Sequence, residues 1–371
     1  MTALFIGLMS GTSLDGVDGV IAAFDDGVTV HAHASVGFDA ALRAELLALN
    51  QPQGVDELHR AALAANRLAR HYAAVVRQLL DRTSPAAGSV RAVGAHGQTV
   101  RHRPGAFDGT GYTLQLNNPA LLAELTGLPV ACDFRSRDVA AGGQGAPLVP
   151  AFHAALFGRP GEVRAALNLG GIANLSLLPG DDGPVRGFDC GPANALLDHW
   201  CQLHRGTAFD AGGAWAASGT VRPALLQRLL AEPYFAHPIP KSTGRDLFHP
   251  QWLAQHLHPD DLAADPRDVQ ATLAELTVRS CADALRLHAP DVRRLIVCGG
   301  GAANEDLMHR LALHLPGVAV DTSTAHGLPA QQVEATAFAW LAQRLLAGEP
   351  GNLPTVTGAR GLRVLGALYP A

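Results

Sequence analysis

A glycine-rich turn near the start of this 371-residue chain carries residue types that could bind a charged ligand. The segment from Ser10 to Asp18 combines glycine backbone N–H groups, hydroxyl donors and the carboxylates of Asp15 and Asp18. Such a set can hold a triphosphate and, directly or through water, Mg2+. It is not a Walker A loop, because it lacks G-K-[ST] and no helix is expected after it. A tight hairpin rich in turn-forming residues is the alternative.

Two further glycine turns follow in the chain. Gly170-Gly171 lies between two apolar runs and is equally typical of a simple bend. Gly299-Gly300-Gly301 precedes a predicted helix, so it is either a close-packed turn or a place where a nucleotide meets a helix N-terminus. The three turns in this order are more specific than any one of them.

Asp189 is the candidate catalytic residue. It ends the short apolar run VRGFD and precedes Gly191-Pro192 and a helix predicted to start near Asn194. The carboxyl end of a strand is where α/β folds gather ligand-binding groups. The alternative is an Asx turn that caps Gly191-Pro192, and the residues alone leave both interpretations open.

Charged residues and a histidine follow two other predicted strands. In DFRSRD, Asp133, Arg135, Arg137 and Asp138 either pair with one another or offer a guanidinium to a carboxylate ligand. Arg135 is favoured for that role because it comes first after the strand. His96, after the run VRAVGA, is either a hydrogen-bonding partner for a sugar or a core histidine whose hydrogen bonds are satisfied internally.

The composition restricts the class of partner. The chain is 48% hydrophobic with a net charge of −5, so it offers no basic surface for nucleic acid or for a membrane, and we expect a small-molecule partner. The start MTALFIGLMSGTS has no basic n-region and predicts a strand instead of a signal peptide. The five cysteines are scattered, without C-x-x-C spacing, which favours reduced thiols in a cytoplasmic enzyme.

Lys241 is the only lysine among 28 basic residues. It lies in the polar segment PKSTGR, which could close over a ligand. A lysine that persists where arginine is otherwise used suggests a specific contact, because a compact ammonium and a planar guanidinium are not interchangeable. Chance is the alternative.

Apolar runs alternate with helical patterns along the whole chain, as in an α/β fold. The runs 4–8 and 17–24 form a predicted hairpin, and 166–178 predicts a second hairpin of the same kind, which is a weak internal repeat. We therefore expect two similar lobes with one ligand between them. The other predicted elements are a helix over 56–81 capped by Asp56, strands over 90–96 and 128–134, a strand and helix over 293–315 with Asn304 as N-cap, a helix over 333–348 and a final strand.

The Gly-rich stretch 140–150 resembles a crossing between lobes, and we place the boundary near 133–136. This gives an N-terminal lobe over 1–134, to which 349–371 could return, and a C-terminal lobe over 135–348.

Successive blocks follow one another at characteristic spacing from residue 7 to about 366: GLMSGTSLDGVDGV, AHGQTVRHRP, DFRSRDVAAGGQGAPLVP, NLGGIANLS, GFDCGPAN, PKSTGRDLF, CGGGAANEDL and VEATAFAWLA. In the order and spacing of these blocks the chain resembles the anhydro-N-acetylmuramic acid kinase family. This resemblance implies a two-lobed α/β fold of the actin/hexokinase type, which is a duplicated ribonuclease H-like fold, with ATP in the cleft between the lobes. Where the family more often has Gly followed by Asp or Asn, this chain has Asn117-Asn118, a departure that concerns the substrate contacts and not the phosphate turns.

The resemblance also implies an activity: Mg-ATP-dependent conversion of 1,6-anhydro-N-acetylmuramic acid from murein into N-acetylmuramic acid 6-phosphate. Asp189 would activate the water that opens the anhydro bridge, much as a carboxylate does in inverting glycosidases. The family places the ATP phosphates at Gly11, Thr12, Ser13, Leu14, Asp15, Gly16, Val17 and Asp18, with the second phosphate turn at Gly170 and Gly171 and the adenosine side at Gly299, Gly300 and Gly301.

The remaining expectations concern substrate, metal and assembly. We expect Asp133, Arg135 and His96 to contact the sugar, and Asp15 and Asp18 to hold Mg2+. A homodimer is left open by the sequence. The rival hypotheses are another actin-like sugar or acid kinase, an actin-like ATPase that drives conformational change, and a sugar-binding sensor without activity.

Overall fold

The computed structural model describes residues 2–11, 14–25, 27–52, 54–181, 183–244 and 247–371. The chain divides into two compact units: unit 1 is Met1–Phe152 with Gln332–Ala371, and unit 2 is His153–Gln331. The predicted boundary at 134/135 falls inside unit 1, and the returning C-terminal segment begins earlier than the predicted residue 349. The Gly-rich stretch 140–150, predicted as a crossing between lobes, therefore belongs to unit 1. Its backbone is bonded to the C-terminal segment of that unit, because Gln144 N–H donates to the carbonyl of Thr357 at 2.7 Å.

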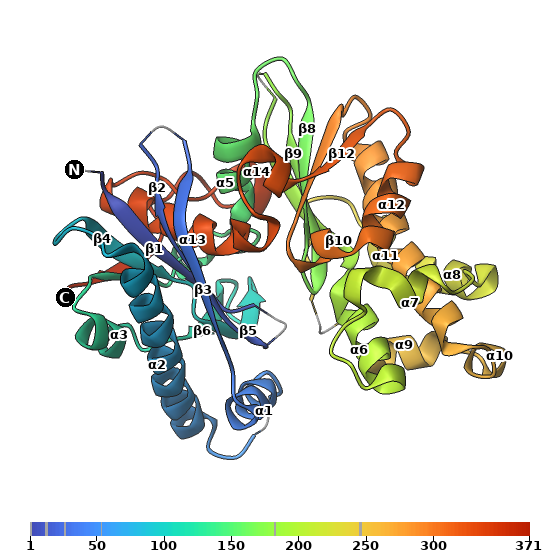
Figure 1. The fold of residues 1–371 in the computed structure, drawn as a ribbon, viewed down its shortest axis with the longest axis horizontal. Helices are drawn as coiled ribbons and strands as arrows, with labels where there is room; N and C mark the ends of the chain where they lie inside the picture. Colours follow the sequence, from blue (N-terminus) through green and yellow to red (C-terminus); the bar gives the residue numbers. More distant parts are fainter. Residues whose placement is uncertain (1, 12–13, 26, 53, 182, 245–246) are drawn as a thin grey trace. The chain divides into compact units, whose positions relative to one another are not determined.

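Unit 1 is built on a mixed sheet whose strand order is β13-β7-β4-β1-β2-β3 (Figure 1). β1 pairs antiparallel with β2 and β2 with β3, whereas β1, β4 and β7 are parallel. The strands of this sheet are β1 (Leu4–Met9), β2 (Gly16–Ala23), β3 (Thr29–Gly37), β4 (Val90–Ala95), β7 (Val130–Cys132) and β13 (Ala367–Tyr369). A separate hairpin consists of β5 (Gln98–Pro104) and β6 (Gly111–Leu116).

The helices of unit 1 cover both faces of this sheet. Alternation along β1 sends Ile6 into a core with α2 and Phe5 into a core with α13. The helices are α1 (Ala40–Leu49), α2 (Glu57–Thr83), α3 (Pro119–Thr126), α4 (Ser136–Ala140), α13 (Val333–Leu346) and α14 (Pro354–Thr357), and α5 (Val149–Phe157) crosses into unit 2. Asp56 was wrongly predicted to cap α2: its backbone is left-handed (φ 49°) and its side chain makes no capping hydrogen bond.

Unit 2 repeats the same plan. Its strand order is β10-β9-β8-β11-β12, with β8, β9 and β10 antiparallel in sequence and β8, β11 and β12 parallel. The strands are β8 (Arg164–Leu169), β9 (Ile172–Leu178), β10 (Arg186–Pro192), β11 (Arg294–Cys298) and β12 (Ala319–Thr322). Both units thus have the ribonuclease H-like strand order, which confirms the predicted duplicated α/β fold of the actin/hexokinase type.

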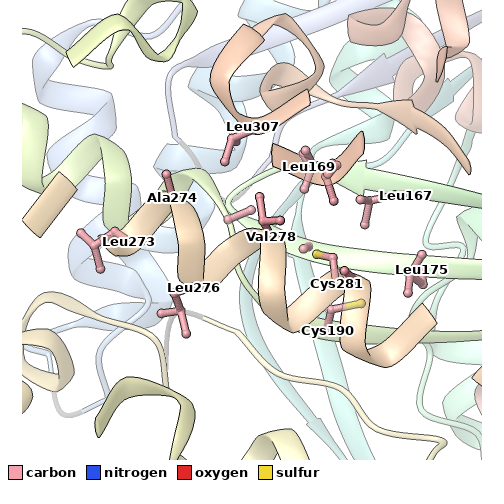
Figure 2. Packing of buried hydrophobic residues seen from close by; sticks show 14 of the residues in the cluster. Leu167, Leu169, Leu175, Cys190, Leu273, Ala274, Leu276, Val278, Cys281 and Leu307 are labelled. Carbon is pink, nitrogen blue, oxygen red and sulfur yellow. The ribbon is translucent and has the colours of Figure 1, made fainter. Parts of the chain in front are cut away.

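Helix α11 (Pro266–His288) covers one face of the second sheet. Figure 2 shows Val278 of this helix near Leu169 of β8, and Cys281 of this helix near Cys190 of β10, and all four are buried. The other helices of unit 2 are α6 (Asn194–Arg205), α7 (Ala214–Ala217), α8 (Pro223–Leu230), α9 (Pro250–His256), α10 (Pro259–Leu262) and α12 (Glu305–His314). Short 3-10 turns are η1 (Ala211–Gly213), η2 (Pro233–Ala236), η3 (Gly300–Ala303), η4 (Ser323–His326) and η5 (Ala330–Gln332).

Candidate functional site

Three predicted site segments of unit 1 lie at one edge of its sheet. Because β1, β4 and β7 are parallel, the residues after their carboxyl ends, Ser10, His96 and Asp133, gather at that edge. Thr12 and Ser13, which the resemblance places against phosphate, lie outside the described residues.

The start of the β1–β2 turn is held by hydrogen bonds that involve the buried side chain of Tyr72. The hydroxyl oxygens of Ser10 and Tyr72 are 3.1 Å apart, and Ser10 donates to the carbonyl of Gly97 at 3.1 Å. The N–H of Gly97 in turn donates to the Tyr72 hydroxyl at 3.0 Å, and the Gln98 amide donates to the carbonyl of Gly11 at 3.2 Å. The first turn is therefore tied to the chain that leaves β4.

Some residues of the predicted phosphate turn serve the fold. Leu14 and Val17 are buried in apolar clusters, and a Cβ on Gly16 would lie 2.5 Å from the carbonyl oxygen of Val36. These three residues can contribute backbone groups to a ligand, but their residue types are set by packing.

The two carboxylates predicted to hold Mg2+ differ in setting. Asp15 is exposed, and its carbonyl accepts from Phe38 N–H at 2.9 Å. Asp18 lies within β2, half-exposed, with Oδ1 3.2 Å from His33 Nε2. Within the described residues, no group of three or more His, Cys, Asp or Glu side chains could hold a metal ion. Two accessible carboxylates nevertheless fit Mg2+ that is bound together with phosphate, because such a site needs only one or two protein oxygens.

His96 holds the Arg135 guanidinium. Nε2 accepts from Arg135 Nε at 3.2 Å and from Nη2 at 2.9 Å, while Nδ1 is 3.3 Å from the carbonyl oxygen of Ser10. Burial, aided by the charge of Arg135, lowers the pKa of His96 to about 3. His96 is therefore neutral, with Nδ1 as donor and Nε2 as acceptor. Both ring nitrogens have partners in the protein, which favours the core-histidine alternative over a direct sugar contact.

The two carboxylates of DFRSRD differ in their partners, because Asp133 is paired within the motif and Asp138 outside it. Exposed Asp133, whose backbone is left-handed (φ 54°), accepts from Ser136 Oγ at 2.5 Å. Fully buried Asp138 accepts from Gly145 N–H at 2.8 Å, from Asn352 at 2.7 Å and from Thr357 at 2.8 Å. Asp138 thereby joins the Gly-rich loop to the C-terminal segment, a role that its sequence position did not reveal.

A group of amide side chains on the β5–β6 hairpin and at the residue directly after it carries unpaired polar atoms. Among the described residues, both polar atoms of the Asn117 side chain and the side-chain oxygens of Gln98 and Gln115 are buried without a hydrogen-bond partner. Buried polar atoms are normally paired, so these atoms fit a polar ligand or water. Asn118, the next residue, is instead structural, because its Oδ1 accepts from Leu121 N–H and caps α3.

In unit 2, Asp189 belongs to a row of polar residues across the sheet. Asp189 faces Asn174 on β9, which faces Asn168 on β8. Residues directly opposite one another share a sheet face, so the three side chains project on the same side. Asparagines that interrupt the apolar run ALNLGGIANLS at both sides of its glycine turn were the signal by which Asn168 and Asn174 could have been found.

The prediction that Asp189 ends its strand is wrong. β10 continues to Pro192, with a register shift after Asp189 that places Gly191 opposite Ala173. This irregularity is a β-bulge, and bulges commonly redirect side chains beside functional sites. The Asp189 Oδ2 accepts from the N–H of Thr243 at 2.9 Å, so its carboxylate contacts a segment well outside the predicted Gly191-Pro192 turn.

The β8–β9 turn receives the start of helix α6. The carbonyl of Gly170 accepts from Asn194 N–H at 3.0 Å, and that of Gly171 accepts from Ala193 and Ala195 N–H at 3.0 and 3.1 Å. A Cβ on Gly170 would find no heavy atom nearer than 3.6 Å. The packing around this glycine thus leaves space for at least a methyl group, unlike that around Gly299 and Gly301.

The three glycines after β11 differ in what they permit. A Cβ on Gly299 (φ 80°) would lie 2.3 Å from Asn168 Oδ1, and one on Gly301 would lie 2.6 Å from Leu169 Cβ. Gly300 is exposed, and its nearest such neighbour is 3.8 Å away. The outer two are therefore required by packing, whereas a ligand can approach Gly300. Asn304 caps the following helix α12, as predicted, by accepting from Leu307 N–H at 3.0 Å.

Crossing a membrane requires a helix of sufficient length and hydropathy. No helix in the ranges that the structure describes is both long and apolar enough to cross one.

Comparison with known proteins places this geometry in a family. Residues 3–371 match the family described as anhydro-N-acetylmuramic acid kinase. The protein of that name from Variovorax paradoxus is 66% identical over 99% of each chain, and that from Cupriavidus metallidurans is 59% identical over 99% of this chain and 97% of its own. Among solved structures, component A of (R)-2-hydroxyglutaryl-CoA dehydratase from Acidaminococcus fermentans is similar with a TM-score of 0.49 and 13% identity, over 91% of this chain and 96% of its own. The chain belongs to the anhydro-N-acetylmuramic acid kinase family, whose members are phosphotransferases.

Proposed function

We propose that this kinase uses ATP to convert 1,6-anhydro-N-acetylmuramic acid into N-acetylmuramic acid 6-phosphate, as a step of murein recycling in the cytoplasm. Family membership over nearly the whole chain supports the reaction class. The observation that carries the residue assignment is the position of Asp189, at a bulge in the polar row that ends beside the Gly170-Gly171 turn. A carboxylate at this position can activate a water molecule for attack on an anomeric carbon, while the glycine turn binds phosphate.

Asp189 is the general base. Its carboxylate takes a proton from the water whose oxygen forms the new bond to the anomeric carbon, and the bond from that carbon to the bridging 6-oxygen breaks. The released electron pair makes the 6-oxygen a nucleophile, which takes the γ-phosphoryl group of ATP and leaves ADP. Ring opening and phosphoryl transfer are thereby coupled.

The glycine turns and two carboxylates serve ATP. Phosphate binding is assigned to the backbone of the turn from Gly11 to Asp18 in unit 1 and to that of Gly170 and Gly171 in unit 2, and the adenosine side is assigned to the accessible Gly300. Asp15 and Asp18 hold Mg2+, which when bound supplies positive charge to neutralise the phosphates. These assignments are supported by the space beside Gly170 and Gly300 and by the accessibility of both carboxylates.

Arg135 and the β5–β6 amides serve the sugar. A guanidinium held in place by His96 can form two hydrogen bonds to the lactyl carboxylate of the substrate. The buried amide atoms of Asn117 and Gln98 can hydrogen bond neutral groups such as hydroxyl or acetamido. Asp133, which is exposed after β7, is the remaining candidate contact.

The test is Asp189→Asn, assayed by mass spectrometry of the product formed from ATP and the anhydro sugar. Asparagine can still accept from Thr243 N–H but cannot take up the proton, so the rate should fall by about 100-fold to 10,000-fold. Hydrolysis of the bridge and phosphorylation should fall together by the same factor, while ATP binding measured by calorimetry is retained. A folded variant that makes the 6-phosphate at nearly the wild-type rate would remove Asp189 from the mechanism.

A further inference from the structure

Asp189 lies on the edge strand of the second sheet, where residues of the segment 234–243 take the place of a neighbouring strand. β10 is the edge strand of the second sheet, so one row of its backbone groups has no neighbouring strand. At Asp189 these groups are paired nonetheless: its N–H donates to the carbonyl of Lys241 at 3.2 Å, and its carbonyl accepts from the Tyr234 hydroxyl at 2.8 Å. The segment therefore replaces a strand at this single residue.

The same segment also contacts the Asp189 side chain. Thr243 N–H donates to Asp189 Oδ2 at 2.9 Å. Tyr234, Lys241 and Thr243, here named the edge clamp, thus fix both the backbone and the carboxylate of Asp189. A base anchored at its N–H, its carbonyl and one carboxylate oxygen has little freedom to turn away from its proton donor.

The side chain of Lys241 connects two members of the edge clamp, because it contacts both the backbone and the ring of Tyr234. Its ammonium donates to the carbonyls of Tyr234 at 3.1 Å and Phe235 at 2.9 Å, and Nζ lies 4.8 Å from the centroid of the Tyr234 ring. The Tyr234 ring is itself buried and packs edge-on against Phe248. One compact cation therefore joins the two ends of the clamp, a task in which a longer planar guanidinium cannot place its charge at the same point.

We propose that Lys241 is a positioning residue for catalysis: by holding the edge clamp together, it orients the Asp189 carboxylate toward the water that this base activates. The inference rests on the proposed role of Asp189. It also accounts for the only lysine of the chain, which the sequence singled out without explaining.

The test compares Lys241→Met with wild type. Methionine keeps much of the stem and removes the donors and the charge. We expect kcat to fall by about 10-fold to 100-fold, because small misplacements of a catalytic group cost rates of that order. The KM for ATP should stay within about twofold of wild type. Calorimetry should still find one ATP site per chain. Lys241→Arg should also remain below wild type.

Tyr234→Phe supplies a second variant. It keeps the ring under Lys241 and removes only the hydroxyl that donates to Asp189, so kcat should fall again without a change in the KM for ATP. The matched control is Arg344→Met. Arg344 also stacks over an aromatic ring, 5.3 Å from Trp340, and donates to the carbonyl of Pro350 at 3.1 Å, but it belongs to unit 1, whereas the clamp belongs to unit 2. Its loss should lower stability at most and leave kcat unchanged.

A double-mutant cycle separates this inference from the proposed function. In an Asp189→Asn background, Lys241→Met should lower the residual rate by no more than about twofold, because no base remains to be oriented. If Asp189→Asn is inactive while Lys241→Met and Tyr234→Phe turn over like wild type, the clamp has no catalytic role and the base assignment stands. An equal loss from Lys241→Met in both backgrounds would also overturn the positioning role. A fully active Asp189→Asn protein overturns the base assignment and the inference with it.

Discussion

His96 accepts two hydrogen bonds from Arg135, with its Nε2 3.2 Å from Nε and 2.9 Å from Nη2 of the guanidinium. The pair spans two strand ends, because His96 follows β4 and Arg135 follows β7. Burial, together with the charge of Arg135, lowers the pKa of His96 to about 3, so the imidazole stays neutral and Nε2 remains a hydrogen-bond acceptor. His96 therefore orients a cation without carrying charge itself.

Replacing His96 by phenylalanine should weaken sugar binding through Arg135. Phenylalanine keeps an aromatic ring, but Nε and Nη2 of the guanidinium lose their acceptor while Nη1 keeps the carbonyl of Gly145 at 2.8 Å. Removal of a buried hydrogen-bond partner costs about 1 to 3 kcal/mol. The KM for the anhydro sugar should rise about 10-fold, and the KM for ATP should rise less. Steady-state kinetics with each substrate varied in turn measure both. His31→Phe, at an exposed histidine of β3, is the control, and an unchanged sugar KM in His96→Phe contradicts the orienting role.

Close contact between α13 and the first sheet should make Gly94 intolerant of a side chain. A Cβ on Gly94 would lie 2.1 Å from the carbonyl oxygen of Phe338, a backbone atom that cannot move without the helix. Gly94→Ala should therefore lower the free energy of unfolding by about 1 to 3 kcal/mol or more. At Gly37, also in this sheet, the nearest atom to an added Cβ is 3.7 Å away, so Gly37→Ala is the matched control. Urea unfolding of the two variants should separate them, and equal stabilities would refute the packing argument.

Much of the fold could be predicted because its signals are local. Apolar runs joined by glycine turns predicted both hairpins, and Asn304 before an amphipathic helix predicted the cap of α12. Asp56 was misassigned as a cap because the residue type matches but its backbone is left-handed. The position of Asp189 within β10 depends on a bulge, which nothing in VRGFDCGP indicates.

The candidate site could be predicted only in part, since its contacts are remote in sequence. His96 meets Arg135 across 39 positions, and Asp138 meets Thr357 across 219. Residue types alone therefore left open whether His96 contacts sugar and whether the charges of DFRSRD pair together. Lys241 was noticed for its rarity, but its partners follow from the path of the chain beside β10.

The buried carboxylate of Asp138 should be essential to the C-terminal segment. Its two oxygens accept from Gly145, Asn352 and Thr357, all donors. Asp138→Asn would turn an NH2 group toward at least one of these donors, at a cost of about 1 to 3 kcal/mol. Lower stability in urea and faster proteolysis after residue 349 are expected. Asp133→Asn changes the same atoms at an exposed site five positions earlier, and it should do neither.

The buried histidine of unit 2 should make this unit sensitive to acid. His153 is fully buried, with Nδ1 2.8 Å from Ser176 Oγ, and burial lowers its pKa to about 3 from an ordinary 6.5. Between these two pKa values the unfolded chain binds more protons at this group than the folded one, so stability rises with pH across that window and is lost as pH falls through it. The contribution of one such group approaches about 1.4 kcal/mol per pH unit.

His153→Leu should therefore reduce the pH dependence of unfolding between pH 6.5 and about 3, whatever it does to stability at pH 7. Tryptophan fluorescence in urea is the suitable measurement, because Trp200, Trp215 and Trp252 all lie in unit 2. His309→Leu, at an exposed position of α12, is the control and should keep the wild-type slope. If His153→Leu unfolds with the same pH dependence as wild type, His153 is not held neutral by the fold, because only a histidine whose protonation differs between the folded and unfolded states can produce this slope.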